Sequence, residues 1–272
     1  MAFRAGAPAT DQEGRMTTLA RAIAALEPAG GGWRGTVPDN WLQGRTAYGG
    51  FSTALALHAA KTSDTDLPPL RSVQVAFVGP LAGTITVTAR RLRRGRNAAF
   101  VQADVVGDAG LGLCATFVFM TPQASRIDHR AGVSPAFPLP GPDERRVRPP
   151  EGVAFMHNFE FVDRRDPPTG PAEWLRWGRL RERDGLDPDI ALVAVADGLP
   201  PAALKLVGGL APVSSMTWLM NLVAPPQTRE GWWLMRATSD HASAGFSSQP
   251  MAIWNAAGAA VAEQMQGVAV FA

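Results

Sequence analysis

The sequence predicts an α+β protein made of two tandem units, each with a curled antiparallel sheet wrapped around one central helix. Three observations support this fold class. An order of one strand, one helix and four strands occurs twice along the chain of 272 residues. The helix in each half is apolar on nearly all sides, so it must be buried by other elements. A segment rich in Pro, Arg and Asp, with no hydrophobic period, separates the halves.

The first unit is predicted to cover residues 16–121, after a flexible N-terminal stretch at residues 1–15. Alternation of Val73, Val75 and Phe77 places three apolar side chains on one face of a strand. The run FSTALALHAA after Gly49-Gly50 is typical of a buried helix. The predicted elements are a short helix at 16–26, a strand at 33–37, the helix at 49–60 and strands at 70–78, 84–94, 99–106 and 113–120.

Residues 122–152 form the predicted linker, and residues 153–272 form the second unit. Asp187 followed by Pro188 is the pattern of a helix start, with Asp as the N-cap and Pro in the first turn. We expect this helix to continue through residue 207 with a bend at Pro200-Pro201. The other predicted elements are strands at 154–162, 174–181, 215–224, 232–238, 246–254 and 260–271.

The halves match in order but differ in their polar residues. When the two apolar helices are aligned by eye, Gly50 corresponds to Asp197. When the last strands of the halves are aligned, Val118 corresponds to Gln266. A carboxylate and a carboxamide in one half only suggest a fused pair of like units that has kept one active centre.

Composition excludes several classes of protein. The chain is 46% hydrophobic and 18% charged, which is the balance of a globular protein. A formal net charge of +2 is too small to predict nucleic-acid binding. The single cysteine, Cys114, excludes an internal disulfide framework and fits a reducing compartment. Because no run is apolar enough for a secretory peptide or a membrane span, we expect a cytoplasmic protein without a membrane partner.

Five short motifs, in this order and spacing, give the chain a resemblance to a known family. They are Tyr48-Gly49-Gly50, Val193-Ala194-Val195-Ala196-Asp197, Ser239-Asp240-His241-Ala242, Gly245-Phe246-Ser247-Ser248-Gln249 and Gln266-Gly267-Val268-Ala269-Val270-Phe271. With the repeated strand–helix–sheet order, they resemble the double hotdog fold of acyl-CoA thioesterases of the bacterial thioesterase II type. The resemblance runs from Trp33 to the C-terminus, apart from the linker.

That resemblance implies an Asp, a hydroxyl residue and a Gln that together hold the hydrolytic water. The Asp falls on Asp197 and the Gln falls on Gln266. The position expected for a Thr falls on Val213, and Ser214 and Ser215 follow it directly. Either a serine supplies the hydroxyl through a shift of one residue, or the triad is incomplete.

The residues themselves also favour a site at Asp197 and Gln266. Asp197 lies in an apolar stretch, where a carboxylate needs a partner, water or a function. A buried Gln266 amide without a partner would cost about 1 to 3 kcal/mol. In the structural alternative, Asp197 caps a helix break before residues 198–200, and Gln266 binds a backbone group.

The helix start at Gly49-Gly50-Phe51 is the candidate oxyanion site. Glycine lets the backbone approach a ligand closely, and the N-terminus of a helix is electropositive. Close packing of this helix is the structural alternative.

Three functions are compatible with these residues. The first is a thioesterase that hydrolyses acyl-CoA by direct attack of an oriented water, without a cofactor or a metal. The second is a hotdog hydratase or dehydratase, although no His accompanies Asp197 on its helix. The third is a non-catalytic protein that binds acyl thioesters. In each case we expect a homo-oligomer.

Overall fold

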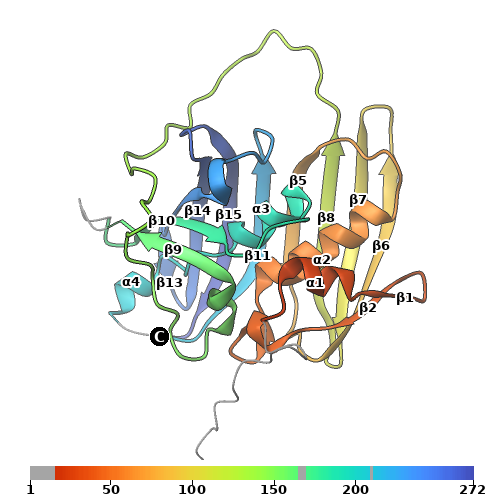
Figure 1. Cartoon of the computed structure of the whole chain (residues 1–272), viewed down its shortest axis with the longest axis horizontal. Helices are drawn as coiled ribbons and strands as arrows, with labels where there is room; N and C mark the ends of the chain where they lie inside the picture. The colour runs from red at the N-terminus through yellow and green to blue at the C-terminus, as the bar shows by residue number, and fades with distance from the viewer. Residues whose placement is uncertain (1–15, 165–169, 209–210) are drawn as a thin grey trace, which may run out of the picture.

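The structure is a computed structural model that describes residues 16–164, 170–208 and 211–272. The prediction for residues 1–15 lies outside the described residues. The fold is built on one 13-stranded sheet, with two buried helices on one face (Figure 1). Every strand pair among the described residues is antiparallel.

The first half follows the predicted order closely. Its additions are a strand, a 3-10 turn and a separate two-stranded hairpin before the buried helix. The elements are α1 (Leu19–Ala24), β1 (Glu27–Ala29), β2 (Gly32–Thr36), η1 (Asp39–Trp41), β3 (Leu42–Gln43), β4 (Thr46–Ala47), α2 (Gly49–Thr62), β5 (Leu70–Phe77), β6 (Thr84–Arg94), β7 (Ala98–Gly107) and β8 (Gly110–Met120).

The second half differs from prediction in two of its longer elements, and it also has a short 3-10 turn at Arg229–Gly231 and a short strand at His241–Ser243 that were not predicted. The strand expected at 154–162 begins as a 3-10 turn, and the helix expected to reach residue 207 stops at Ala196, before Gly198 and two prolines. The elements are η2 (Ala154–Asn158), β9 (Phe159–Asp163), β10 (Glu173–Leu180), α3 (Pro188–Ala196), α4 (Leu204–Val207), β11 (Val213–Leu222), η3 (Arg229–Gly231), β12 (Trp233–Thr238), β13 (His241–Ser243), β14 (Phe246–Asn255) and β15 (Ala260–Val270).

The strand order is the same in both halves. The first half runs β2-β6-β7-β8-β5 across the sheet, and the second runs β10-β12-β14-β15-β11. In the first half β2, which precedes α2, pairs with β6, the second strand after α2. In the second half β10, which precedes α3, likewise pairs with β12. The halves join where β5 pairs with β11, with Val75 opposite Trp218 and Val73 opposite Met220.

This junction confirms one part of the predicted architecture and corrects another. We expected two like units whose sheets join edge to edge, and β5 and β11 form that join. We also expected each sheet to be curled around its own helix. The structure has one continuous sheet that neither curls round nor closes, because β1 and β9 end the strand order and pair with one neighbour each. Backbone pairing of β5 with β11 satisfies the edges at which two separate sheets would have ended, so the two halves share one sheet.

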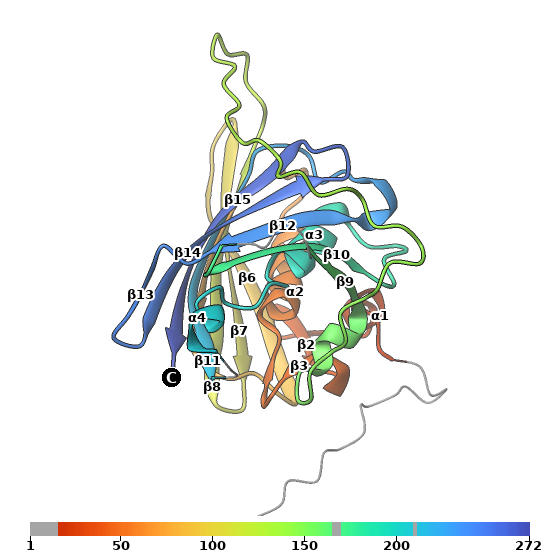
Figure 2. The ribbon, with the colours of Figure 1, turned by 90° about the vertical axis from the view of Figure 1, so that its left-hand side faces the viewer.

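The two central helices lie antiparallel against each other. At one end, a Cβ on Gly50 of α2 would lie 2.7 Å from the carbonyl oxygen of Ala194 in α3, so only glycine permits this approach. At the other end, Lys61 Nζ bonds to Asp187 Oδ2 at 2.6 Å and to Asp189 Oδ2 at 2.8 Å. Figure 2 shows both helices against the sheet. No helix in the described part is long and apolar enough to cross a membrane.

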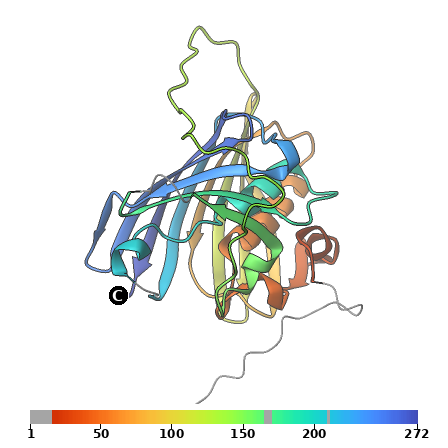
Figure 3. The same cartoon turned by 60° about the vertical axis from the view of Figure 1, so that its left-hand side comes forward.

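The predicted linker has no regular helix or strand; residues 122–133 are exposed, and parts of the later segment pack on the molecule. It leaves the sheet at β8, as Figure 3 shows, and reaches the second half at η2. Phe137 and Leu139 pack on a cluster that includes Trp177 of β10. Its last residues, among them Val147 and Gly152, line the cavity described next.

Candidate active site

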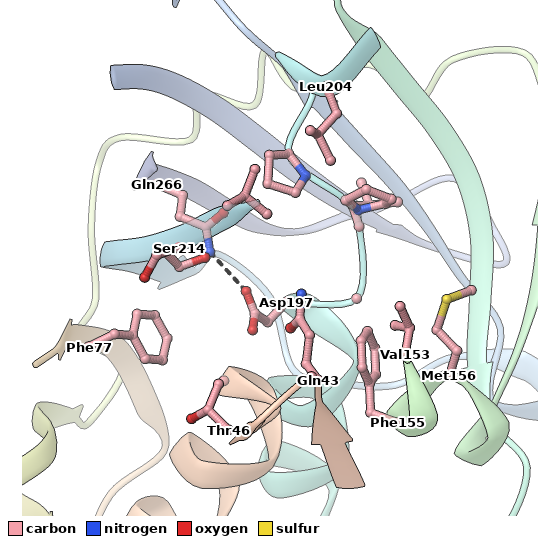
Figure 4. A pocket seen from close by; sticks show the side chains of 18 of the residues that line it. Gln43, Thr46, Phe77, Val153, Phe155, Met156, Asp197, Leu204, Ser214 and Gln266 are labelled. Carbon is pink, nitrogen blue, oxygen red and sulfur yellow. Dashed lines mark hydrogen bonds between the residues drawn. The ribbon is translucent and has the colours of Figure 1, made fainter. Parts of the chain in front are cut away.

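A cavity of about 960 Å³ lies where the two halves meet. The first half contributes the β3–β4 hairpin, the first turn of α2 and the segment after β5. The second half contributes the end of α3, the start of β11 and Gln266 of β15. Figure 4 shows Asp197 and Gln266 facing each other in this cavity, near Phe77 of the first half. A cavity of this size accommodates a small-molecule ligand.

Asp197 is the only carboxylate among the described residues that line the cavity. It follows the last residue of α3, and its Oδ1 accepts a hydrogen bond of 2.8 Å from Gln266 Nε2. The backbone N–H of Gly50 also donates to this carboxylate. Burial raises the pKa of Asp197 to about 7, although both hydrogen bonds favour the charged form. A carboxyl with this pKa can hold or release a proton near neutral pH.

Gln249 fixes the orientation of Gln266. Gln249 Nε2 donates to Gln266 Oε1 at 2.6 Å, and Gln249 Oε1 accepts from the backbone N–H of Ala202 at 2.9 Å. Because the oxygen of Gln266 faces a donor, its NH2 group must face Asp197. Gln249 is fully buried, so no bulk water competes with it for the oxygen of Gln266.

The helix start at Gly49-Gly50-Phe51 lies at the site, but its three residues differ in what they face. Gly49 lines the cavity, and a Cβ there would lie 2.6 Å from Asp197 Oδ2 and 2.8 Å from the Phe77 ring. The N–H of Gly50 is directed to Asp197. The Phe51 side chain is in the core, stacked on Trp41 at 4.9 Å.

Among the described residues, neither Ser214 nor Ser215 is hydrogen-bonded to the other two residues of the expected triad. Val213, Ser214 and Ser215 all line the cavity. No hydrogen bond joins either serine hydroxyl to Asp197 or Gln266 in the described part of the chain. Figure 4 shows the Ser214 hydroxyl turned away from the Asp197 carboxylate.

Sequence reasoning missed Gln249 and the cavity wall from the linker. Gln249 stood in one of the motifs, but a polar residue after Ser247 and Ser248 gave no sign of a buried strand face. The described residues contain no group of three or more His, Cys, Asp or Glu side chains that could hold a metal ion.

Two family models match the sequence, and together they cover most of the chain. The acyl-CoA thioesterase N-terminal domain matches residues 37–121, and the acyl-CoA thioesterase C-terminal domain matches residues 133–270. The chain belongs to the acyl-CoA thioesterase family. No curated protein matches it by sequence.

Solved structures confirm that this thioesterase family member has a hotdog-type fold. A protein of Alicyclobacillus acidocaldarius with a hot dog fold is similar at a TM-score of 0.81 and 23% identity, over 92% of this chain and 97% of that one. Acyl-CoA thioesterase II TesB2 of Mycobacterium marinum is similar at a TM-score of 0.75 and 20% identity, over 92% and 96%. The dehydratase domain of RzxB from Pseudomonas fluorescens is less similar, with a TM-score of 0.52 and 13% identity over 92% and 98%.

Proposed function

We propose that the protein hydrolyses acyl-CoA to a free acid and CoA by direct attack of water, with Asp197 as the general base. The observation that carries this proposal is a carboxyl with a pKa of about 7, held by Gln266 and Gly50 in a cavity between the halves. Membership of the acyl-CoA thioesterase family supports the same reaction.

In this mechanism the bound water loses a proton to Asp197 while its oxygen attacks the thioester carbonyl carbon. The tetrahedral intermediate then collapses with cleavage of the C–S bond. The proton on Asp197 passes to the departing thiolate, which leaves as the thiol of CoA. Gln266 orients the water. One hydrogen of its NH2 group is donated to Asp197, and the second is available to donate to the water that Asp197 binds.

The oxyanion of the intermediate needs N–H donors, and we assign this role to the start of α2. Its first N–H groups have no partner within the helix. Gly49 is the residue of Gly49-Gly50-Phe51 that lines the cavity, whereas the N–H of Gly50 already serves Asp197. Ser214 and Ser215 stay candidates for a further contact to the water, through a change of rotamer.

Substitution of the base tests the proposal. Asp197→Asn should lower kcat by about 10² to 10⁴ while the protein stays folded, because the amide has the same shape and cannot take a proton. Release of free thiol from a panel of acyl-CoAs measures the rate, and circular dichroism checks the fold. Wild-type rates in the folded variant would refute Asp197 as the base.

The same panel separates the alternatives. A non-catalytic binding protein would bind acyl-CoA without releasing thiol, and a hydratase or dehydratase would change the acyl chain and leave the thioester intact. A double hotdog with units at 16–121 and 153–272 joined by a linker at 122–152, a homo-oligomeric state and a cytoplasmic location remain predictions.

A further inference from the structure

Arg176 is a buried cation on the inner face of β10, and it lines the cavity. Its side chain is 4% exposed. The guanidinium is paired with Asp163, through Nε and through Nη2 at 3.2 Å. The remaining group, Nη1, is buried and has no hydrogen-bond partner in the described part of the chain. A buried donor without an acceptor costs free energy, so this nitrogen calls for a ligand oxygen.

Two further donors lie beside Arg176. Trp174 precedes it on the same face of β10, and its buried Nε1 also has no partner in the described residues. The Arg176 guanidinium carbon is 5.1 Å from the centroid of the Trp174 ring. Lys205 Nζ, from α4, is 4.1 Å from the same centroid. Trp174 and Lys205 both line the cavity.

The cations of the cavity lie at this place, with Asp163 beside both of them and Glu173 beside Lys205, so the unpartnered Nη1 of Arg176, rather than a large net charge, favours an anion here. Arg176 and Lys205 are the cations among its described lining residues, and Asp197 is the carboxylate. An unpartnered indole N–H is not sufficient evidence alone, since Trp177 also has one. Trp177, however, belongs to the cluster on the other face of β10 and does not line the cavity. The combination of charge, burial and access to the cavity is found at Arg176.

We propose that Arg176, Trp174 and Lys205 bind a negatively charged oxygen group of the substrate, the carboxylate of an acyl chain that ends in a second acid group. This inference rests on the proposed function in that the cavity takes acyl-CoA. Asp163 already neutralises part of the charge of Arg176, so a singly charged carboxylate matches the site better than a phosphate of CoA. The enclosure of Arg176 between Trp174 and Phe161, whose ring centroid is 5.2 Å away, also suits a group that sheds most of its water.

Binding to Asp197→Asn protein tests this subsite without hydrolysis. Isothermal titration calorimetry would compare adipoyl-CoA with hexanoyl-CoA, which has the same chain length and no terminal carboxylate. We expect adipoyl-CoA to bind about 10- to 100-fold more tightly, as for a hydrogen bond to a charged group. Adding Arg176→Met should abolish this difference, and adding Trp174→Phe should reduce it by about 3- to 10-fold.

Trp177→Phe is the matched control, because it removes an unpartnered indole N–H outside the cavity and should leave the difference unchanged. If Arg176→Met does not fold, Trp174→Phe and Lys205→Gln replace it in the test, because both variants keep the ion pair between Arg176 and Asp163. Equal binding of the two thioesters by the Asp197→Asn protein would overturn the carboxylate assignment.

Hexanoyl-pantetheine distinguishes the other source of negative charge. If Arg176→Met weakens both CoA thioesters equally and leaves hexanoyl-pantetheine unaffected, the anion is a phosphate of CoA, and the acyl assignment is wrong. Because affinity is the readout, failure of the subsite can be told from failure of the proposed hydrolysis. The latter is measured separately, as thiol release from hexanoyl-CoA by the wild type.

Discussion

At the scale of single residues, Asp197 lies between the ends of two helices with opposite effects on its charge. It follows the C-terminus of α3, whose partial negative charge disfavours a carboxylate. It also faces the N-terminus of α2, which favours a carboxylate and supplies the N–H of Gly50. Burial dominates, so the folded protein favours the neutral acid up to about pH 7.

The raised pKa predicts how stability depends on pH. The usual pKa is 3.8 and the folded value is about 7, so the folded state binds the proton of Asp197 more tightly than the unfolded state does. The resulting contribution to the free energy of unfolding is complete below about pH 4 and is lost as the pH rises through about 7. Asp197→Asn should therefore gain stability over wild type between pH 4 and 8, by at most about 4 kcal/mol. Urea unfolding at several pH values measures the difference.

Asp64→Asn is a control with the opposite sign. Although desolvation opposes them, hydrogen bonds from Arg91 and Arg94 hold the pKa of Asp64 below its usual value. Loss of this carboxylate should therefore cost stability at neutral pH and less in acid. A constant difference between Asp197→Asn and wild type across pH would contradict the raised pKa of Asp197.

Gln249 should act as a positioning residue for the reaction. Gln249→Met removes the donor that fixes Gln266, so the Gln266 amide can turn and Asp197 loses a hydrogen bond to its charged form. We expect kcat to fall about 10-fold and the pH–rate profile to move to higher pH. Gln264→Met is the matched control. Gln264 lies on the same face of β15 as Gln266 and accepts a hydrogen bond from Trp218, but it does not line the cavity. An unshifted profile would limit Gln249 to a structural role.

At the scale of elements, the contact between α2 and α3 joins the two halves through one lysine and one helix cap. Asp187 Oδ1 accepts from the N–H groups of Asp189 and Ile190, and Asp187 Oδ2 accepts from Lys61. Asp187→Ala should cost about 1 to 2 kcal/mol, mostly from loss of the cap. Asp189→Ala removes a partner of Lys61 but keeps the cap, so it should cost less. Denaturant unfolding followed by tryptophan fluorescence compares them, and equal losses would exclude the cap as the main term.

Elements with a long hydrophobic period could be predicted from the sequence, and short ones could not. Alternation located β5, and the Asp187-Pro188 pair located the start of α3. By contrast, β1 and β13 have three residues each and depend on their partners in the sheet. The apolar run of α3 continues past its end, so composition alone did not reveal that Asp197 follows the last turn.

The same limit applies to the site. Asp197 and Gln266 could be proposed because each falls on a motif of the family resemblance, and Asp197 is also a carboxylate within an apolar run. Arg176 could not, because its strand also carries Glu173 and Arg179, and so a charged residue gave no sign of burial. The depth of Arg176 follows from the pairing of β10 with β9 and β12, which are set by contacts between segments far apart in sequence.

At the scale of the whole molecule, the outer face of the sheet carries apolar residues near the junction of the halves. Leu219 and Met265 are direct cross-strand neighbours on β11 and β15, 38% and 45% exposed. If the predicted homo-oligomer pairs these faces between two copies, Met265→Lys should shift it toward monomer. Light scattering after size exclusion measures the mass. Leu111→Lys, a similar change on exposed Leu111 near the β7–β8 turn, should have no effect, and equal masses in all three proteins would refute this interface.

The pairing of β5 with β11 places Gly50 and Asp197 in one site although they come from different halves of a single chain. A covalent tether keeps the two halves at a high effective concentration, whatever the amount of protein in solution. The site therefore assembles by an intramolecular step, and extreme dilution should leave the activity per chain unchanged. A chain damaged in one half also cannot borrow that half from a neighbour, so two inactive variants mixed together should stay inactive.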